Sequence, residues 1–252
     1  MIDVVKRLKN PKSQLLLLLA ALTAVALAGA SDPVSAACIL GTSVAAALLA
    51  EWAFFGAVSS TSLQSAAISG AIIGLLVAPG ADPLFAWTAA VIAIASKKLL
   101  VFHAAKHIFN PAAFGLAVAM LIFGNRINWW GNASVVLVIL GAGLILFRLR
   151  RLSLPFAYVI ARLAGMLLLT GAGAGRAMLL LPNLFFAFIM LVEPKTSPGK
   201  RGEQWIFGGV CGILATVYYR FLPGREGDLL ALLTLNLLRP SISFSNIRFG
   251  RK

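Results

Sequence analysis

The chain consists of long runs of apolar residues separated by short segments rich in charged residues, proline and glycine. Hydrophobic residues make up 60% of its 252 residues and charged residues only 12%, whereas an ordinary soluble domain has roughly 25% charged residues. These runs predict an all-α, polytopic membrane protein with about ten transmembrane helices. We place the runs at residues 13–30, 35–55, 64–79, 84–102, 111–124, 133–147, 155–171, 177–192, 204–222 and 228–238.

Several of these runs are too short for an ordinary crossing. Residues 64–79 reach only about 24 Å as an α-helix, whereas the hydrocarbon core of a bilayer is about 30 Å thick. The run at residues 228–238 is shorter still. Because lipid cannot satisfy a free backbone end, a short run must end inside the protein. We therefore expect short, broken helices.

The charged residues are strongly biased towards lysine and arginine. The chain has 22 of them against 8 aspartates and glutamates, a net charge of +14. With the N-terminus in the cytoplasm, seventeen basic residues fall on the cytoplasmic side and four on the opposite side, in agreement with the positive-inside rule. This predicts a multi-pass protein of the cell (inner) membrane with both termini cytoplasmic and a basic cytoplasmic tail at 239–252. Basic clusters between apolar runs argue against nucleic acid as a partner.

The first run allows a second interpretation. Its basic start, its leucines and the small residues Ala28-Gly29-Ala30 are also typical of a secretory signal peptide. Cleavage there would leave nine crossings instead of ten.

A short pattern occurs twice along the chain. Val77–Pro83 and Val192–Pro198 both read V-x-P-x-x-x-P, and each ends an apolar run. About thirty residues later in each case, a Phe-x-Pro triplet opens a further run, at Phe109–Pro111 and at Phe221–Pro223. We interpret the matching order and spacing as an internal repeat.

This repeat predicts the domain organisation. The chain forms a single integral membrane domain, 1–252, whose halves are approximately 13–124 and 133–238. Five crossings in each half is an odd number, so the second half is expected to be inverted relative to the first. Inverted repeats with interrupted helices place their functional sites near the middle of the membrane.

Several motifs, in this order, resemble one known family. They are Ala95-Ser96-Lys97-Lys98, Phe109-Asn110-Pro111-Ala112, Phe186 to Pro198, Trp205-Ile206-Phe207-Gly208 and Leu232 to Pro240. Over roughly residues 60–245 the chain resembles the RnfD family of membrane subunits of the Rnf electron-transport complex. That family is similar to the NqrB subunits of the sodium-pumping NADH:quinone oxidoreductase. The resemblance implies a ten-helix inverted-repeat fold and electron transfer through flavins, coupled to ion movement in the full complexes.

One feature of that family is missing. Its members carry a flavin mononucleotide bonded to a threonine in the external loop between the fifth and sixth spans, but the loop at 124–132 contains no threonine. The resemblance therefore implies at most a non-covalent flavin, FMN or riboflavin, and the departure speaks against full Rnf-type ion pumping.

Two segments are the candidate cofactor-binding elements. Asn110-Pro111 has the residues of a helix start, and the free amides there either serve only the helix or face an anionic or carbonyl-bearing ligand. Glu193, Pro194 and Thr196 belong to the most polar segment near a helix end. There the glutamate either caps a turn or binds flavin hydroxyls and organises the entry of electrons.

Charges near the membrane supply the remaining candidates. Lys97 begins a basic stretch that also contains Lys98, His103, Lys106 and His107. The stretch either sets the membrane orientation and contacts anionic lipid, or it binds a phosphate-bearing cofactor or an acidic partner protein. No residue pattern predicts a metal site.

Two further charges lie inside apolar runs, Glu51 and Arg162. Intramembrane charges are costly when unpaired, so pairing of these two with each other is one possibility.

The leading hypothesis is a membrane-embedded electron-transfer subunit. It would bind flavin non-covalently and exchange electrons with a cytoplasmic flavoprotein reductase or with other subunits of a redox complex. This electron transfer could be coupled to ion transport. No nucleophile–base pair or paired carboxylates predict catalytic residues, so whether the chain belongs to an enzyme stays open. The alternatives are a small-solute channel or transporter, which an inverted-repeat fold would suit equally well, and a scaffold without cofactor.

Overall fold

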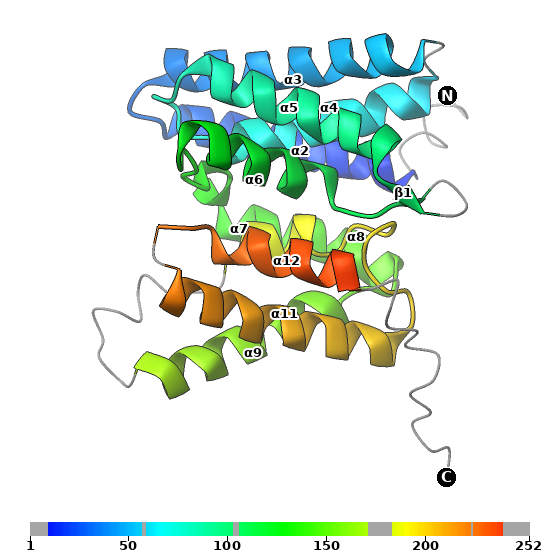
Figure 1. Cartoon of the computed structure of the whole chain (residues 1–252), viewed down its shortest axis with the longest axis vertical. Coiled ribbons are helices and arrows are strands. Elements are labelled where there is room, and N and C mark those ends of the chain that lie inside the picture. The colour runs from blue at the N-terminus through cyan, green and yellow to red at the C-terminus, as the bar shows by residue number, and fades with distance from the viewer. Residues whose placement is uncertain (1–9, 57–58, 103–105, 171–182, 223, 239–252) are drawn as a thin grey trace.

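The computed structural model describes residues 10–56, 59–102, 106–170, 183–222 and 224–238, and these residues are almost entirely helical (Figure 1). The strands found there are the two-residue pair β1 (Val101–Phe102) and β2 (Lys106–His107), which are antiparallel. The all-α prediction is confirmed. The predicted basic tail at 239–252, His103 and the first part of the run at 177–192 lie outside the described residues.

The first half of the chain forms one helical layer, the upper one in Figure 1. Helix α3 packs against α4 and α5, and α5 packs against α6. The helices of this layer are α2 (Pro11–Ala28), α3 (Pro33–Phe55), α4 (Ser60–Leu76), α5 (Pro83–Leu99) and α6 (Pro111–Phe123).

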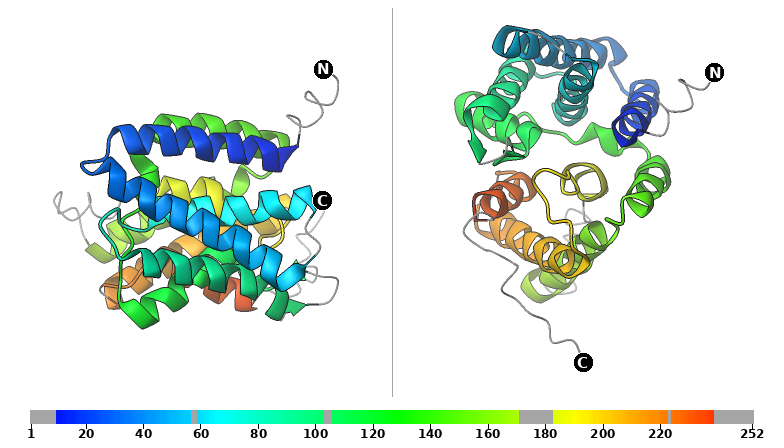
Figure 2. Two further views of the ribbon diagram at one scale, coloured as in Figure 1. Left: turned by 90° about the horizontal axis from the view of Figure 1, so that it is seen from above. Right: turned by 90° about the vertical axis from the view of Figure 1, so that its right-hand side faces the viewer.

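The second half forms the lower layer, which the right-hand view of Figure 2 separates clearly from the first. Helix α11 packs along α9 and α12, and two short π-helical turns, η3 and η5, interrupt the regular helices. The connecting turn η2 (Trp130–Ala133) packs against α2 and α4 of the first layer. The elements of the second layer are α7 (Val135–Leu137), η3 (Val138–Ala142), α8 (Gly143–Arg148), α9 (Ser153–Thr170), η5 (Phe186–Met190), α11 (Arg201–Phe221) and α12 (Gly227–Leu238).

Four helices of the first layer begin with the same dipeptide pattern, an asparagine or aspartate followed by proline. The side-chain oxygen accepts a hydrogen bond from a free backbone N–H of the first turn, and the proline at the first helical position has no N–H to leave unpaired. In the cap of α3 the hydrogen bonds from Ser35 hold the pKa of Asp32 below its ordinary value. The four pairs are Asn10-Pro11, Asp32-Pro33, Asp82-Pro83 and Asn110-Pro111.

Glycines allow the helices of each layer to approach closely. A side chain on Gly115 of α6 would meet the backbone of α5 at Ala89, and one on Gly212 of α11 would lie 2.6 Å from the carbonyl oxygen of Tyr158 on α9. Small residues at helix contacts are typical of membrane proteins, where packing rather than exclusion of water holds helices together.

The two V-x-P segments lie at opposite ends of α6. The first joins the loop that follows α6, because Ala78 N donates to Arg126 O over 2.7 Å and Val77 bridges Ile127. The second meets the start of α6, because Asn110 Nδ2 donates to Met190 O over 3.1 Å. Both α4 and η5 thus end near α6, but at different ends of it.

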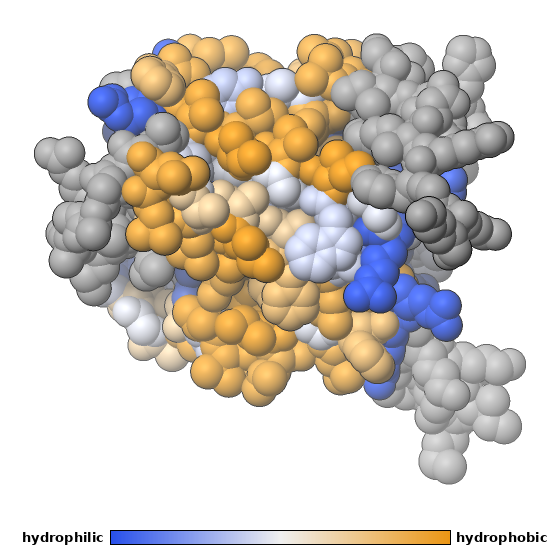
Figure 3. Space-filling view, turned by 90° about the horizontal axis from the view of Figure 1, so that it is seen from below, coloured by the Kyte–Doolittle hydropathy of each residue, from blue (hydrophilic) through white to orange (hydrophobic). Residues whose placement is uncertain are grey.

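Two described helices, α2 and α3, are long and apolar enough to cross a membrane. Several shorter helices are also apolar, among them α4, α6 and α12. Large apolar side chains such as Leu121, Phe147 and Leu168 are exposed on the outside of the layers. Figure 3 shows such an apolar face of the second layer, with hydrophilic residues at its left and right edges. The predicted number of ten crossings stays a prediction.

Candidate functional site

The start of α6 is one of the places where the two layers are tied together. Asn110 is 4% exposed; its Oδ1 accepts from Ala113 N over 3.0 Å, and its Nδ2 donates to Met190 O over 3.1 Å. The backbone N–H of Asn110 donates to Asn236 Oδ1 over 2.8 Å. Every polar group of the Asn110 side chain therefore has a partner within the protein, and its role as a cap and as a link between layers is clear from these contacts.

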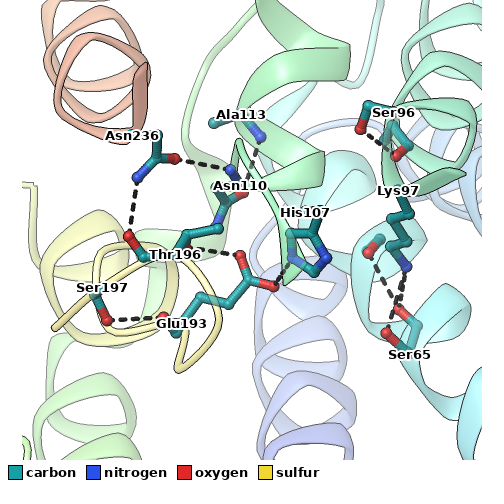
Figure 4. Close-up of polar contacts among 12 residues, drawn as sticks. Ser65, Ser96, Lys97, His107, Asn110, Ala113, Glu193, Thr196, Ser197 and Asn236 are labelled. Atoms are coloured by element: carbon teal, nitrogen blue, oxygen red, sulfur yellow. Dashed lines mark hydrogen bonds and ion pairs between the residues drawn. The ribbon is translucent and has the colours of Figure 1, made fainter. Parts of the chain in front are cut away.

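Glu193 stands beside this link, in the turn that follows η5. Its Oε1 lies 3.0 Å from His107 Nε2, and its Oε2 accepts a hydrogen bond from Thr196 Oγ1 over 3.1 Å (Figure 4). Its backbone oxygen accepts from Ser197 Oγ over 2.7 Å. The turn thus fixes the carboxylate of the second layer against the imidazole of the first.

A cavity of about 270 Å³ lies between the layers next to these residues. Its walls come from the first turns of α2, from α4, from the start of α6, from η3 and α8, and from the segment between Phe188 and Lys195. Most of the wall is aliphatic. The polar side chains of the wall are Lys12, Ser65, Ser69, His107, Asn110, Glu193 and Lys195.

Four of the six predicted cofactor-binding residues line this cavity, namely Asn110, Pro111, Glu193 and Pro194. Thr196 does not line it; the side chain is fully buried behind Glu193, and its backbone oxygen accepts from Asn236 Nδ2 over 3.1 Å. Two segments that are far apart in sequence therefore form one wall.

Ser65 lies between Lys97 and the cavity. Its Nζ donates to the backbone oxygen of Ser65 over 3.2 Å and lies 3.4 Å from Ser65 Oγ, and Ser65 lines the cavity. The charged groups close enough to act on the Lys97 ammonium are Glu51, Glu193, Lys195 and Lys12. Lys97 thus adds positive charge near the cavity without contacting it.

Three residues of the site were not among the predicted ones. His107 appears in the sequence only as part of a basic stretch, although it precedes Asn110 by three residues. Asn236 is a single amide within an apolar run, which is a usable signal because such residues are costly in a membrane unless bonded. Ser65 carries no signal of its own.

The two intramembrane charges do not pair with each other. Arg162 Nη2 lies 4.0 Å from Asp228 Oδ1 in the second layer, whereas Glu51 belongs to α3 of the first layer and lies near Lys97. The suggested Glu51–Arg162 pair is therefore wrong, because the two residues belong to different helical layers. Asp228 also accepts from Tyr158 Oη over 2.7 Å.

The opposite end of α6 has a polar contact of its own. Trp129 Nε1 and Asn125 Nδ2 donate to the carboxylate of Glu226 over 2.8 and 3.1 Å. Burial of this loop carboxyl raises the pKa of Glu226 above its ordinary value. The contact joins the loop after α6 to the start of α12.

The cavity has the composition of a ligand pocket. Such pockets are typically lined by apolar side chains with a few placed polar groups, and here the aliphatic wall carries the seven polar side chains named above. The described residues contain no group of three histidines, cysteines or acidic residues that could hold a metal ion.

Neither the scan against protein-family models nor the search of curated proteins finds a match for the chain.

Proposed function

We propose that this chain is a membrane-embedded electron-transfer subunit of the kind it resembles, the RnfD family of the Rnf complex, and that it binds a flavin non-covalently. The observation that carries the proposal is the cavity between the two layers. One wall of it is built from both motifs of the resemblance, Asn110-Pro111 and Glu193-Pro194. FMN and riboflavin are the candidate cofactors.

The membrane part of the proposal is supported by the surface. Two helices have the length and apolar character of a crossing, and the exposed apolar side chains continue over the shorter helices. In a bilayer these side chains would meet lipid, whereas in water they would form an apolar patch far larger than a monomer normally exposes. We propose about ten crossings, with the cavity open towards the cytoplasm.

The inverted repeat is supported by the two V-x-P segments. They end α4 and η5 at opposite ends of α6, as a pair of half-crossing elements related by a twofold axis in the membrane plane would. Interrupted helices that meet between repeats are where transport and cofactor sites of such proteins lie.

The chain's own residues would bind and orient the cofactor, while a bound flavin would supply one- and two-electron chemistry. The aliphatic wall would exclude water, and the cations Lys12, Lys97 and Lys195 would attract anionic groups to the mouth. The electrons would come from a cytoplasmic flavoprotein or from other subunits of a redox complex.

A visible spectrum of the purified protein tests the proposal. We expect flavin absorbance bands that dithionite bleaches, with FMN or riboflavin identified by mass after denaturation. Replacing Ala112, which lines the cavity, by phenylalanine should remove the chromophore, whereas the same change at Ala117, on α6 but outside the cavity wall, should leave it. Colourless wild-type protein that moves solute across liposomes would instead favour the channel alternative.

A further inference from the structure

His107 and Glu193 form a hydrogen-bonded pair in the wall of the cavity, and each comes from a different layer. Their side chains are 6% and 25% exposed, and Nε2 and Oε1 are 3.0 Å apart. Both residues line the cavity. A pair that served only to hold the layers together could lie anywhere along their contact, but this one faces the space where a ligand would lie.

The geometry assigns the protons of the imidazole. A carboxylate is an acceptor only, so Nε2 carries the hydrogen that points at Glu193. Within the described part of the chain no hydrogen bond to the other nitrogen, Nδ1, is formed. Figure 4 shows this nitrogen turned away from Glu193, towards the side of the cavity that Ser65 lines.

The charges around His107 come from several elements. Glu193 is its direct partner, and the ammonium groups of Lys12 on α2 and Lys195 after Glu193 belong to the same cavity wall. Lys97 on α5 and Glu51 on α3 act on each other, and Lys97 also interacts with Glu193. Imidazole is the side chain whose ordinary pKa allows it to gain and lose a proton near neutral pH.

We propose that His107 supplies and accepts the proton that accompanies reduction and oxidation of the redox ligand in this cavity, with Glu193 as its positioning partner. This inference rests on the proposed function. A flavin that takes up two electrons from a reduced flavoprotein also takes up two protons. In its doubly protonated form His107 would give one of them, as its Nδ1–H bond breaks and an N–H bond forms on the ring. The second proton, and the one that restores His107, would come from cytoplasmic water.

A proton donor is needed in the cavity wall because a charge on the reduced ligand would be energetically costly there. Reduction without a proton would leave an anion against an aliphatic wall inside a membrane, where an uncompensated charge is expensive. A proton donor in the wall removes that cost at the moment the electrons arrive. A positioned donor of this kind typically contributes a factor of about 100 or more to a rate.

The test uses the full-length protein carrying its flavin, with dithionite as reductant in a stopped-flow experiment. The variant His107→Gln keeps a hydrogen-bond donor towards Glu193 but cannot carry a proton. We expect it to bind flavin as the wild type does, to be reduced on the order of 100-fold more slowly at pH 7, and to lose the solvent deuterium isotope effect that the wild type shows.

Two further variants separate a proton carrier from a structural pair. Glu193→Gln should move the pH midpoint of the reduction rate downwards, because the imidazolium loses its carboxylate partner. Glu203→Gln, which removes the same charge from the Lys200–Glu203 pair outside the cavity wall, should change neither the reduction rate nor its pH midpoint. In the ligand-free protein, ¹⁵N NMR of labelled histidine should show a ring with its Nε2 hydrogen-bonded to Glu193, and this signal should be lost in His107→Gln.

Each outcome decides the matter. Wild-type protein without flavin overturns the proposed function and this inference with it. Flavin-bearing His107→Gln that is reduced at the wild-type rate with an unchanged isotope effect overturns the inference alone. If His107→Gln does not fold, an unchanged pH midpoint in Glu193→Gln overturns it.

Discussion

The hydroxyl of Tyr158 donates a hydrogen bond of 2.7 Å to Asp228 Oδ1, so that α9 is tied to the first turn of α12. The guanidinium of Arg162 lies 4.0 Å from the same oxygen, and its Nε and Nη1 are buried without a hydrogen-bond partner among the described residues. Asp228 is therefore the group on which two buried side chains depend.

Replacing Asp228 by alanine should strongly destabilise the second layer. The change leaves a buried cation and a buried hydroxyl without their acceptor, and breaking such a pair on one side costs about 3 kcal/mol or more. Tyr158→Phe removes one donor to this carboxylate but leaves it beside Arg162, and should cost less, about 1.5 kcal/mol. Thermal unfolding in detergent measures both, and equal losses for the two variants would show that the aspartate does not serve Arg162.

The contact between α5 and α6 should tolerate no side chain at Gly115. An added Cβ would meet Ala89 O and lie 2.9 Å from Ala93 Cβ, so Gly115→Ala must push the helices apart and should cost about 1–3 kcal/mol. Gly209→Ala is the matched control, because its Cβ would meet nothing within 4 Å and alanine favours the helix. A stability of Gly115→Ala at or above that of the control would contradict the packing described here.

The stability of the loop contact at Glu226 should depend on pH. Burial raises its pKa in the folded protein, so the folded state binds the proton more tightly than the unfolded chain, whose glutamate pKa is about 4.3. This contribution is full below that value and is lost as pH rises through the folded pKa. Glu226→Gln, which can still accept from Trp129, should remove that part of the pH dependence. Parallel unfolding curves of the two proteins from pH 4 to 7 would argue against it.

Asn236 should matter for the cavity although it does not line it. Its amide bonds Asn110 N and Thr196 O, so Asn236→Ala leaves two buried backbone groups unpaired, at about 1–3 kcal/mol each. We expect lower stability and weaker flavin retention during gel filtration. Thr234→Ala, on the same helix, removes a hydroxyl bonded to Leu230 O and Tyr218 and should retain the flavin.

The two proline segments should lie on opposite sides of the membrane. Gly80 and Gly199 lie in or next to these segments, and an added side chain would meet nothing at either position. In a background with Cys38 and Cys211 replaced by alanine, Gly80→Cys should react with an impermeant maleimide in intact spheroplasts. Gly199→Cys should react only after permeabilisation. Labelling of both from one side would disprove the inverted arrangement.

Helix positions could largely be predicted from the sequence. Apolar runs bounded by Asn-Pro or Asp-Pro coincide with α2, α3, α5 and α6, because a cap with a proline at the first helical position is a local signal. The interruption of the run at 133–147 by the π-helical turn η3 has no such signal, since it depends on how the layer packs.

The long-range contacts of the site were harder to foresee. Asn110 and Glu193 could be chosen as candidates because each is a polar residue at the end of an apolar run. Their partners, Asn236 and His107, come from elsewhere in the chain, and the sequence contains no distance information to join them. The suggested Glu51–Arg162 pair is wrong for the same reason. A buried charged side chain needs an oppositely charged partner, but the sequence does not show which residue lies beside it in the fold.

Helix α6 contains 13 residues and is therefore only about 20 Å long. It runs from the cavity wall to the loop that meets the first proline segment, so in the proposed bilayer it would be shorter than the hydrocarbon core of about 30 Å. A transmembrane voltage would drop steeply along this short path, at about 2.3 kcal/mol per elementary charge for each 100 mV. Under the proposed function, the arrival of electrons in the cavity would then depend on the membrane voltage.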